Sequence, residues 1–360
     1  MKIIHIMYSG MGGHGDVIFP KIQNDNENQY VIIFIGIEKV FSSYTNICKK
    51  LNVKYYYLNY KKKIKSFKKI IRVLSKEKPK IIFSHTETVF PLLIYKLNNL
   101  NVKLISFQHV SLKIKKFKNK FFNFFEYIFF DKIIFLTDTY KNHVLKDNKF
   151  INLKKKSLTI PTGLKDLKSL KNKIINKKKI NVGMSTRLVK GKKILNLINL
   201  IKFNYENNKL PLFLSIIGKG VDFKKISRLI EKLKLSKYIS LNTLNSENEL
   251  NIWNNNLSIY IHFSTGETLS TSIIRALRSA TPIIASNTSG LKEMINTKSC
   301  RNGFLVDDNN YYKILKLIEK LTNKNTLYKK FSKNSFKLYK KYYSLDNSFK
   351  KYKKMINLYR

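Results

Sequence analysis

The sequence has little acid, few cysteines and no long apolar run. Asp and Glu number 22 against 70 Lys and Arg, which gives a formal net charge of +48. The two cysteines, Cys48 and Cys300, lie far apart without metal-ligand or redox spacing, so a disulfide scaffold is excluded and a reducing compartment is the simplest inference. No window reaches the roughly 18 apolar residues that a membrane span requires. Residues 1–8 lack a small-residue cleavage site, so we expect a strand there rather than a signal peptide.

A charge of +48 is typical of nucleic-acid-binding proteins. The chain contains no helix-turn-helix, zinc-finger, RNA-recognition or cold-shock pattern, so we expect no specific nucleic-acid partner. The excess of Lys, Asn, Ile, Phe and Tyr is also typical of an AT-rich genome, which would place Lys on surfaces without any partner. Hydrophobic residues make up 43% of the chain and aromatic residues 13%, so there is enough apolar material to form cores.

Short apolar runs alternate with longer Lys-rich helical patterns along most of the 360 residues. This alternation predicts strand-helix-strand units around mainly parallel sheets, and the length suits two domains. The expected strands of the first domain are residues 3–8, 30–35, 54–58, 80–84, 103–108 and 132–136. Those of the second domain are residues 180–184, 212–217, 238–241, 257–263 and 282–285, with an amphipathic helix over 223–233.

The domain boundaries are expected at segments rich in Pro, Gly and Lys. The first domain is predicted to cover residues 1–164 and to end at a Pro and Gly turn, 161–163. A Lys-rich linker, 165–179, leads to the second domain, 180–335, and a helical segment, 336–360, closes the chain. Two parallel sheets joined in this way predict a cleft lined by the carboxyl ends of strands, where ligands usually bind.

Two kinds of signal fall at the ends of first-domain strands. Residues 9–16 form a glycine-rich loop before a helix, where free amides and a closely approaching backbone suit an anionic or sugar group. His85 and His109 each follow an apolar strand directly, so both are expected at the cleft edge of the first sheet. From the residues alone, a plain glycine turn and structural histidines remain the alternatives.

The second domain has an Arg and Lys cluster, residues 187–193, directly after its first strand. Guanidinium and ammonium groups on a strand-to-helix turn suit a diphosphate through charge-assisted hydrogen bonds. Basic residues on turns are common in so Lys-rich a chain. Arg187 is the informative residue, because this composition seldom uses Arg.

A later loop of this domain combines Gly, Glu and hydroxyl residues before a helix. Glu267 can accept hydrogen bonds from sugar hydroxyls, while the helix N-terminus favours phosphate. Ordinary helix capping is the alternative role for Glu267. Ile273, Ile274 and Leu277 are expected in the core as the buried stripe of that helix.

Taken together, these segments resemble the GT-B-fold glycosyltransferases, in particular the large retaining family 4 type, the glycosyl transferases group 1. The order and spacing of the motifs carry the resemblance, which covers nearly the whole chain. The motifs are the glycine loop, His109, residues 160–163, 187–192 and 216–220, the Glu267 loop, residues 282–286 and 302–306, and a final helix near 343–345. The resemblance implies an α/β fold of two Rossmann-like parallel-sheet domains facing a central cleft, with the C-terminal helix packing back on the first domain.

The resemblance also implies roles for individual residues. The family's glycine loop places backbone near the donor, which assigns donor contacts to Gly12 and Gly13, and its donor-sugar histidine corresponds to His109. The first Glu of its paired-Glu motif, which contacts donor-sugar hydroxyls, corresponds to Glu267. Its phosphate-binding residues correspond to Arg187 and Lys192, with Lys190 as the alternative to Lys192. The other implied donor-binding positions are Gly218, Thr268, Leu269, Ser270, Thr271 and Arg275.

The chain departs from the family pattern at the second Glu of that motif. Arg275 stands eight residues after Glu267, where the family commonly has an acid that accepts from the nucleotide ribose. Arg carries five donors and no acceptor, so it cannot repeat that contact. Thr268 and Ser270 also replace glycines that often follow the first Glu. A catalytically degenerate GT-B scaffold is therefore an alternative to an active enzyme, and a basic nucleic-acid-binding protein is a more remote one.

By resemblance, we expect a metal-independent, retaining hexosyltransferase that moves sugar from a nucleotide-linked donor, UDP or GDP, to a carbohydrate or lipid-linked acceptor. No cofactor is expected beyond this co-substrate. His109, Glu267, Arg187 and Lys192 are the expected catalytic residues. There is no Asp-x-Asp triplet of the metal-dependent kind, since Asp307 and Asp308 are adjacent. A bacterial surface polysaccharide or lipopolysaccharide pathway in the cytoplasm is the expected setting.

A basic and aromatic stretch follows His109, from Lys113 to Phe130. In the related enzymes this part of the first domain often touches the bilayer, and lysines near anionic headgroups contribute about 1 kcal/mol each. We therefore expect a peripheral position on the inner face of the cytoplasmic membrane. An ordinary buried helix with a solvated Lys face is the alternative.

Overall fold

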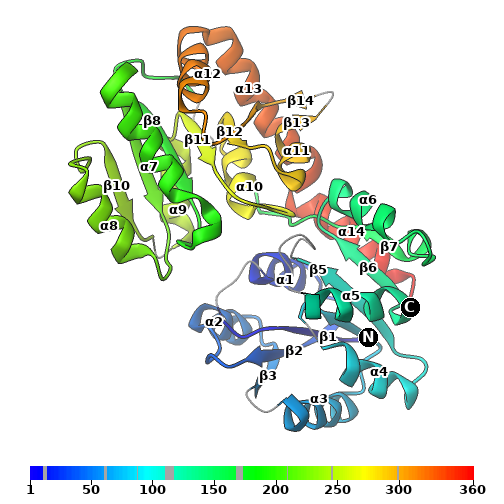
Figure 1. The fold of residues 1–360 in the computed structure, drawn as a ribbon. Coiled ribbons are helices and arrows are strands. Elements are labelled where there is room, and N and C mark those ends of the chain that lie inside the picture. The colour runs from blue at the N-terminus through cyan, green and yellow to red at the C-terminus, as the bar shows by residue number, and fades with distance from the viewer. Residues whose placement is uncertain are drawn as a thin grey trace. The chain divides into compact units, whose positions relative to one another are not determined.

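The computed structural model describes residues 1–10, 14–60, 63–86, 88–109, 117–167, 173–208, 210–244, 246–297 and 300–360. The chain divides into two compact units (Figure 1). The first unit consists of Met1–Lys165 together with Leu345–Arg360, and the second is Asp166–Ser344.

The described residues of the first unit form a seven-stranded parallel sheet in the order β3-β2-β1-β4-β5-β6-β7. Five consecutive residues of β1 are buried, as expected for a strand covered on both faces. The order reverses between β1 and β4, where Ile3 pairs with Ile81. The strands are β1 (Lys2–Tyr8), β2 (Gln29–Gly36), β3 (Lys54–Asn59), β4 (Ile81–Ser84), β5 (Lys103–Gln108), β6 (Lys132–Phe135) and β7 (Ser157–Thr159).

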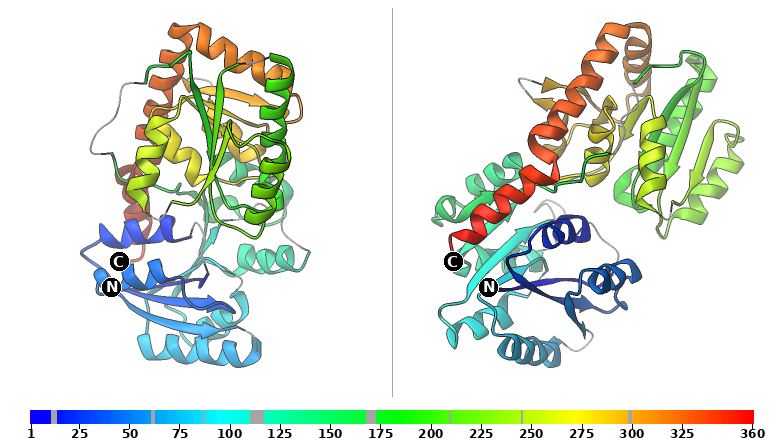
Figure 2. Two further views of the ribbon diagram at one scale, coloured as in Figure 1. Left: turned by 90° about the vertical axis from the view of Figure 1, so that its left-hand side faces the viewer. Right: turned by 180° about the vertical axis from the view of Figure 1, so that it is seen from behind.

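Helices lie on both faces of this sheet (Figure 2). In the first unit, α3 packs on α4 and α4 packs on α5, while α1 packs on the C-terminal helix α14. The amide of Leu345 donates to the carbonyl of Leu164 at 2.8 Å, which joins α14 to this unit. The helices are α1 (His14–Gln23), α2 (Ser42–Lys50), α3 (Lys63–Glu77), α4 (Val89–Leu97), α5 (Phe117–Phe129), α6 (Asp138–Asp147), η1 (Lys154–Lys156) and α14 (Leu345–Asn357).

The described residues of the second unit form a six-stranded parallel sheet in the order β10-β9-β8-β11-β12-β15 and a short antiparallel β13-β14 pair. The strands are β8 (Ile180–Ser185), β9 (Leu212–Ile217), β10 (Ile239–Asn242), β11 (Ile259–His262), β12 (Ile283–Ser286), β13 (Asn296–Thr297), β14 (Cys300–Arg301) and β15 (Gly303–Val306). The helices are η2 (Lys190–Lys192), α7 (Ile194–Phe203), η3 (Asn204–Asn208), α8 (Phe223–Lys232), α9 (Glu247–Asn256), α10 (Thr271–Arg278), α11 (Ser289–Ile295), α12 (Tyr311–Asn323), α13 (Asn325–Leu338) and η4 (Tyr339–Tyr343).

The two parallel α/β sheets confirm the predicted fold class. The second unit, Asp166–Ser344, begins within the expected linker and ends within the expected terminal helical segment, whose remainder, Leu345–Arg360, belongs to the first unit. Lys173 Nζ donates to the carbonyls of Asn254, Asn255 and Leu257 at 3.0, 2.7 and 2.9 Å. The Tyr339 hydroxyl donates to Asp166 at 2.8 Å.

No helix within the described ranges has the length and apolar character to cross a bilayer.

Candidate active site

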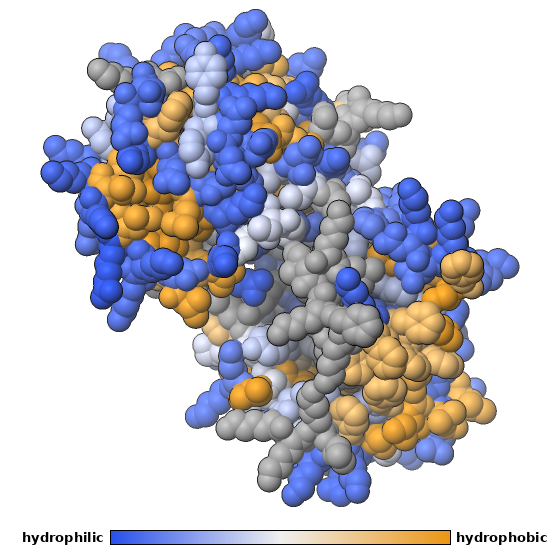
Figure 3. Space-filling view, in the orientation of Figure 1, coloured by the Kyte–Doolittle hydropathy of each residue, from blue (hydrophilic) through white to orange (hydrophobic). Residues whose placement is uncertain are grey.

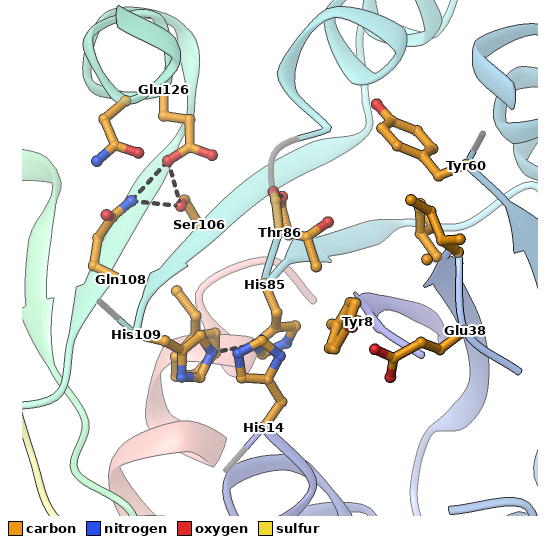
Figure 4. A pocket seen from close by; sticks show the side chains of 16 residues that line it. Tyr8, His14, Glu38, Tyr60, His85, Thr86, Ser106, Gln108, His109 and Glu126 are labelled. Carbon is orange, nitrogen blue, oxygen red and sulfur yellow. Dashed lines mark hydrogen bonds between the residues drawn. The ribbon is translucent and has the colours of Figure 1, made fainter. Parts of the chain in front are cut away.

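The carboxyl end of the first sheet carries a cavity of about 640 Å³. Tyr8 ends β1, His85 follows β4 and His109 follows β5, and all three line the cavity with His14, the first residue of α1 (Figure 4). The strand order reverses between β1 and β4. The cavity therefore lies where open α/β sheets usually bind ligands.

Three histidines lie together on the cavity wall. His85 Nδ1 is 2.8 Å from His109 Nε2, and the ring centroids of His14 and His109 are 4.4 Å apart. Burial, followed by the charges of the neighbouring histidines, holds the pKa of His85 well below its ordinary range. The sequence pattern places His85 and His109 at this edge. The pattern does not single out His14, although a histidine within the glycine-rich loop, residues 9–16, was a usable signal.

A buried carboxylate forms a second polar cluster on the same wall. Ser106 and Gln108 on β5 donate to Glu126 Oε2 at 2.8 and 2.7 Å, and Glu126 on α5 is 4% exposed. A carboxylate offers about four lone-pair sites, so this group can also accept hydrogen bonds from hydroxyls. The sequence pattern does not identify Glu126, because it lies among phenylalanines and interrupts an apolar run.

In the second unit, the predicted basic cluster occupies the turn after β8. Arg187 and Lys190 are exposed. Within the described part of the chain, the Arg187 guanidinium makes no hydrogen bond or ion pair. Leu188 beside it is fully buried, and its amide donates to the carbonyl of Lys219 at 2.9 Å. The buried leucine therefore anchors the turn and leaves the Arg187 side chain toward solvent.

The structure brings Lys192 and Glu267 into direct contact. Lys192 Nζ donates to Glu267 Oε1, and Nε2 of the buried His262 is 3.1 Å from the same oxygen. Burial opposes ionisation of Glu267, but the hydrogen bond and charge of His262 and the charge of Lys192 outweigh it and lower the pKa of Glu267 to about 2. Glu267 is thus a carboxylate at neutral pH and accepts hydrogen bonds only.

The backbone also joins the two loops that carry these side chains. Thr265 N donates to the carbonyl of Gly191 at 3.0 Å. A Cβ on Gly290 would lie 2.2 Å from the carbonyl oxygen of Glu267, so α11 approaches the loop as closely as only glycine allows. These contacts hold Lys192 and Glu267 at the carboxyl edges of β8 and β11, where the strand order of the second sheet reverses.

The residues after Glu267 form the N-terminus of α10. Thr268, Leu269 and Ser270 are buried, and Ser270 Oγ accepts from the amide of Ile273 at 3.4 Å. Thr271 is half-buried. Ser270 therefore caps the helix, the role that the sequence pattern offered as an alternative for Glu267.

Arg275 is held by an acidic residue of the neighbouring helix. Its Nε and Nη2 donate to the two carboxylate oxygens of Glu247 on α9, at 3.2 and 3.0 Å. Arg278 donates to the same carboxylate at 3.2 Å. Although Arg275 stands where the family commonly has an acid, a carboxylate is supplied beside it from α9.

Of the three glycines predicted to contact the donor, the structure describes Gly218. A Cβ on Gly218 would lie 1.9 Å from the carbonyl oxygen of Thr186, so this position needs glycine for the close approach of β9 to the turn after β8. Gly12 and Gly13, by contrast, lie outside the described residues.

The candidate residues thus fall into two groups. His109 lies in the first unit, and the structure brings it together with His85 and His14. Lys192 and Glu267 lie together in the second unit, with Arg187 on the same turn as Lys192. Among the described residues there is no cluster of His, Cys, Asp or Glu that could hold a metal ion.

Part of the chain matches a known protein family and the sequences of known proteins. The family model of glycosyl transferases group 1 matches residues 166–338. An uncharacterized glycosyltransferase of Haemophilus influenzae is 26% identical over 245 residues, a match that covers 66% of this chain and 65% of that protein.

Two solved structures share the fold of the chain. Anabaena HepE in complex with UDP-glucose superposes with a TM-score of 0.80 at 12% identity, over 99% of each chain. The lipopolysaccharide outer core galactosyltransferase WaaB superposes with a TM-score of 0.73 at 16% identity, also over 99% of each chain. The chain therefore has the GT-B fold, and its residues 166–338 match the family model of the glycosyl transferases group 1.

Proposed function

We propose that the protein transfers a sugar from a nucleotide-sugar donor to a carbohydrate or lipid-linked acceptor, with retention at the anomeric carbon. The contact between Lys192 and Glu267 carries this proposal. An ammonium group and a carboxylate lie side by side at the reversal point of the second sheet, and we assign phosphate binding to the first and hydroxyl binding to the second. In a nucleotide sugar the diphosphate and the sugar hydroxyls also lie next to each other, so one ligand can contact both residues.

The leaving diphosphate needs positive charge in the transition state. Arg187 and Lys192 would supply it through charge-assisted hydrogen bonds, the kind of electrostatic stabilisation that is usually the largest catalytic effect. Lys190 is exposed on the same turn and would add to the positive electrostatic potential at the diphosphate. These cations would take the part that a metal ion plays in metal-dependent transferases.

Glu267 would orient the donor sugar. Its lowered pKa, about 2, keeps it an acceptor for sugar hydroxyls at neutral pH. When the diphosphate arrives, Lys192 would exchange part of its contact with Glu267 for phosphate oxygens. The UDP-glucose bound to Anabaena HepE supports a UDP-linked donor over a GDP-linked one.

The first unit would take the acceptor. Its cavity combines the apolar walls of Tyr8, Tyr60 and Phe107 with the carboxylate of Glu126, a mixture of stacking surfaces and fixed acceptors that suits a sugar. His109 at the same cavity would contact the donor sugar. The similarity to WaaB supports a role in surface polysaccharide or lipopolysaccharide synthesis on the cytoplasmic side of the membrane.

The first unit would also bind an anionic membrane surface. Large apolar side chains gather over α4 and α5 (Figure 3). They are Ile94, Leu97, Leu100, Phe121, Phe124 and Phe129, between 46% and 76% exposed. Exposed phenylalanines on a soluble helix are unusual and mark an interaction surface, and Lys120 beside them is exposed as well. Of the lysines expected to contribute, Lys113, Lys115 and Lys116 lie outside the described residues.

The experiment that tests the proposed function is a thermal-shift screen of the full chain against UDP-, GDP- and ADP-linked sugars. A ligand that binds the native state raises its apparent stability, by about 2.7 kcal/mol at a hundred times its Kd. We expect stabilisation by a UDP-sugar and release of UDP when the acceptor is present. A chain that binds the donor without cleaving or transferring it would be the catalytically degenerate scaffold instead.

A further inference from the structure

His262, the last residue of β11, is a buried histidine with hydrogen bonding on one side only. Its side chain is 1% exposed, and its Nε2 is 3.1 Å from Oε1 of Glu267. The other ring nitrogen, Nδ1, is buried and has no hydrogen-bond partner in the described part of the chain. A buried polar atom without a partner costs free energy, so an apolar side chain would fill this place at lower cost. The contact with Glu267 therefore explains why a histidine stands here.

The chemistry of Glu267 determines the direction of this hydrogen bond. The pKa of Glu267 is lowered to about 2, so at neutral pH its two oxygens only accept. Nε2 of His262 must then carry a proton and donate it to Oε1, the same oxygen that accepts from Lys192 Nζ. Both protein donors thus lie on Oε1. Within the described ranges, Oε2 makes no hydrogen bond or ion pair.

The two donors of Oε1 differ in how firmly they are placed. His262 lies on a central strand, between β8 and β12, and its ring stacks on that of Tyr260 with the centroids 6.2 Å apart. Tyr260 is fully buried, and its hydroxyl accepts from the amide of Ser185 and donates to the carbonyl of Ser185, each at 3.1 Å. Lys192 reaches Glu267 through a flexible four-carbon stem instead. The imidazole can therefore stay in place while the ammonium group moves.

We propose that His262 is a positioning residue that holds Oε1 of Glu267, so that Oε2 keeps a fixed place for a hydroxyl of the donor sugar and selects its orientation. The inference rests on the proposed function for the identity of that ligand. When Lys192 moves toward the diphosphate, the imidazole is the donor that remains on Oε1. Without it the carboxylate would be free to rotate about its side-chain bonds, and it would accept from differently oriented hydroxyls with similar affinity.

Two substitutions of His262 separate positioning from packing. Leucine fills the apolar surroundings but cannot donate, whereas the amide of glutamine places an N–H close to the position of the imidazole Nε2. His262→Leu should therefore lose the selection among hydroxyls, and His262→Gln should recover part of it. His143→Leu is the matched control, because His143 Nδ1 also contacts a carboxylate, that of Asp147 at 3.0 Å, but on α6 of the first unit and with a side chain that is 40% exposed.

The test compares the binding of UDP-glucose, UDP-galactose and UDP-mannose to the full chain by calorimetry. These ligands share their diphosphate and differ in the orientation of single hydroxyls, so the ratio of the weakest to the tightest Kd isolates the hydroxyl contacts. We expect a ratio of at least about tenfold in the wild type and in His143→Leu, and of about threefold or less in His262→Leu, with His262→Gln between them. A folded His262→Leu that keeps the full wild-type ratio, or a wild type without preference, would overturn the proposal.

The long-range nitrogen–proton NMR spectrum of the ¹⁵N-histidine-labelled chain at neutral pH tests the hydrogen bond without any ligand. The signals of His262 are those missing from His262→Gln. We expect a proton on Nε2 of His262, and a ring protonated at Nδ1 alone would overturn the arrangement. A wild type with the expected spectrum that binds none of the three UDP-sugars would refute the proposed function and leave the hydrogen bond standing. If His262→Leu does not fold, His262→Asn takes its place, since its amide is one methylene shorter than that of glutamine.

Discussion

Lys192 and Glu267, 75 residues apart in the chain, form a direct ion pair at the carboxyl edge of the second sheet. Their side chains are 16% and 13% exposed, so the pair is shielded from most of the solvent. A partly buried pair of this kind contributes more than a surface pair, and breaking it leaves one charge poorly solvated. The pair therefore holds the two loops of the proposed donor site in register before any ligand binds.

We predict that Lys192→Met lowers the free energy of unfolding by about 1–3 kcal/mol at neutral pH, since it leaves a shielded carboxylate without its cation. The pKa of Glu267 is lowered from 4.5 to about 2, so its contribution is present above about pH 4.5 and is lost as the pH falls toward 2. The difference between wild type and variant should shrink over that range in urea unfolding. Lys202→Met is the control, because Lys202 and Glu206 form an exposed pair at 3.6 Å. Equal effects of the two substitutions would contradict the prediction.

Arg275 offers a test of whether the departure from the family pattern is an adaptation. Arg275→Glu would place a second carboxylate against Glu247 in place of the hydrogen bonds at 3.2 and 3.0 Å. We expect lower thermal stability than in Arg275→Gln, and weaker stabilisation by a UDP-sugar than in the wild type. If folded Arg275→Glu binds the donor more tightly than the wild type, Arg275 weakens donor binding and is not an adaptation.

Lys21 is a buried lysine on α1 that donates to the carbonyl of Val17 at 2.8 Å and is 2% exposed. Burial lowers the pKa of Lys21 from 10.5 to about 7. Between these values the folded protein has released a proton that the unfolded chain still holds, so stability due to this group rises with pH. Lys21→Met should therefore be more stable than the wild type below about pH 7, by a few kcal/mol, and the gap should close toward pH 10.5. Exposed Lys50→Met should show no such trend, and a pH-independent gap for Lys21→Met would contradict the prediction.

The apolar surface over α4 and α5 predicts binding to anionic vesicles. Replacing Phe121, Phe124 and Phe129 by Ser removes three side chains that are 51%, 46% and 50% exposed. Co-sedimentation with vesicles that contain phosphatidylglycerol should fall by at least about tenfold, since each buried phenylalanine contributes roughly 1.5–3 kcal/mol. Phe150→Ser is the control, because Phe150 is fully exposed but lies after α6. Wild-type binding that is insensitive to anionic lipid would count against this surface as a membrane contact.

Most strands of both sheets were predictable from the sequence, because a parallel strand buried on both faces is a continuous apolar run. β1 and β2 show this pattern clearly. The edge strands β7 and β15 were not predicted as strands. They have three and four residues, and Pro and Gly lie within or beside them, so the turn signal dominates the pattern.

The position at the sheet edge was predictable for His85 and His109, which directly follow strands, and for Arg187, which lies two residues after β8. The partners of these residues were not. His5, whose Nδ1 is 2.9 Å from Nε2 of His85, lies inside an apolar strand, and its bond to Tyr352 spans 347 residues, so no local pattern connects these side chains. Likewise, no local pattern connects Glu247 with Arg275, because the two residues of this ion pair lie on different helices. Local patterns place residues at the sheet edge, but side-chain packing decides their partners.

Release of UDP from a UDP-sugar in the presence of acceptor, compared between wild type and Arg187→Ala, tests the central claim most directly. Arg187 is exposed and makes no ion pair within the described residues, so its loss should leave folding and thermal unfolding unchanged. Arg228→Ala, an exposed arginine on α8 of the same unit, is the matched control. The account predicts that Arg187→Ala loses at least about a hundredfold in kcat while Arg228→Ala keeps the wild-type rate. Full activity of Arg187→Ala, or no donor cleavage by the wild type, would contradict it.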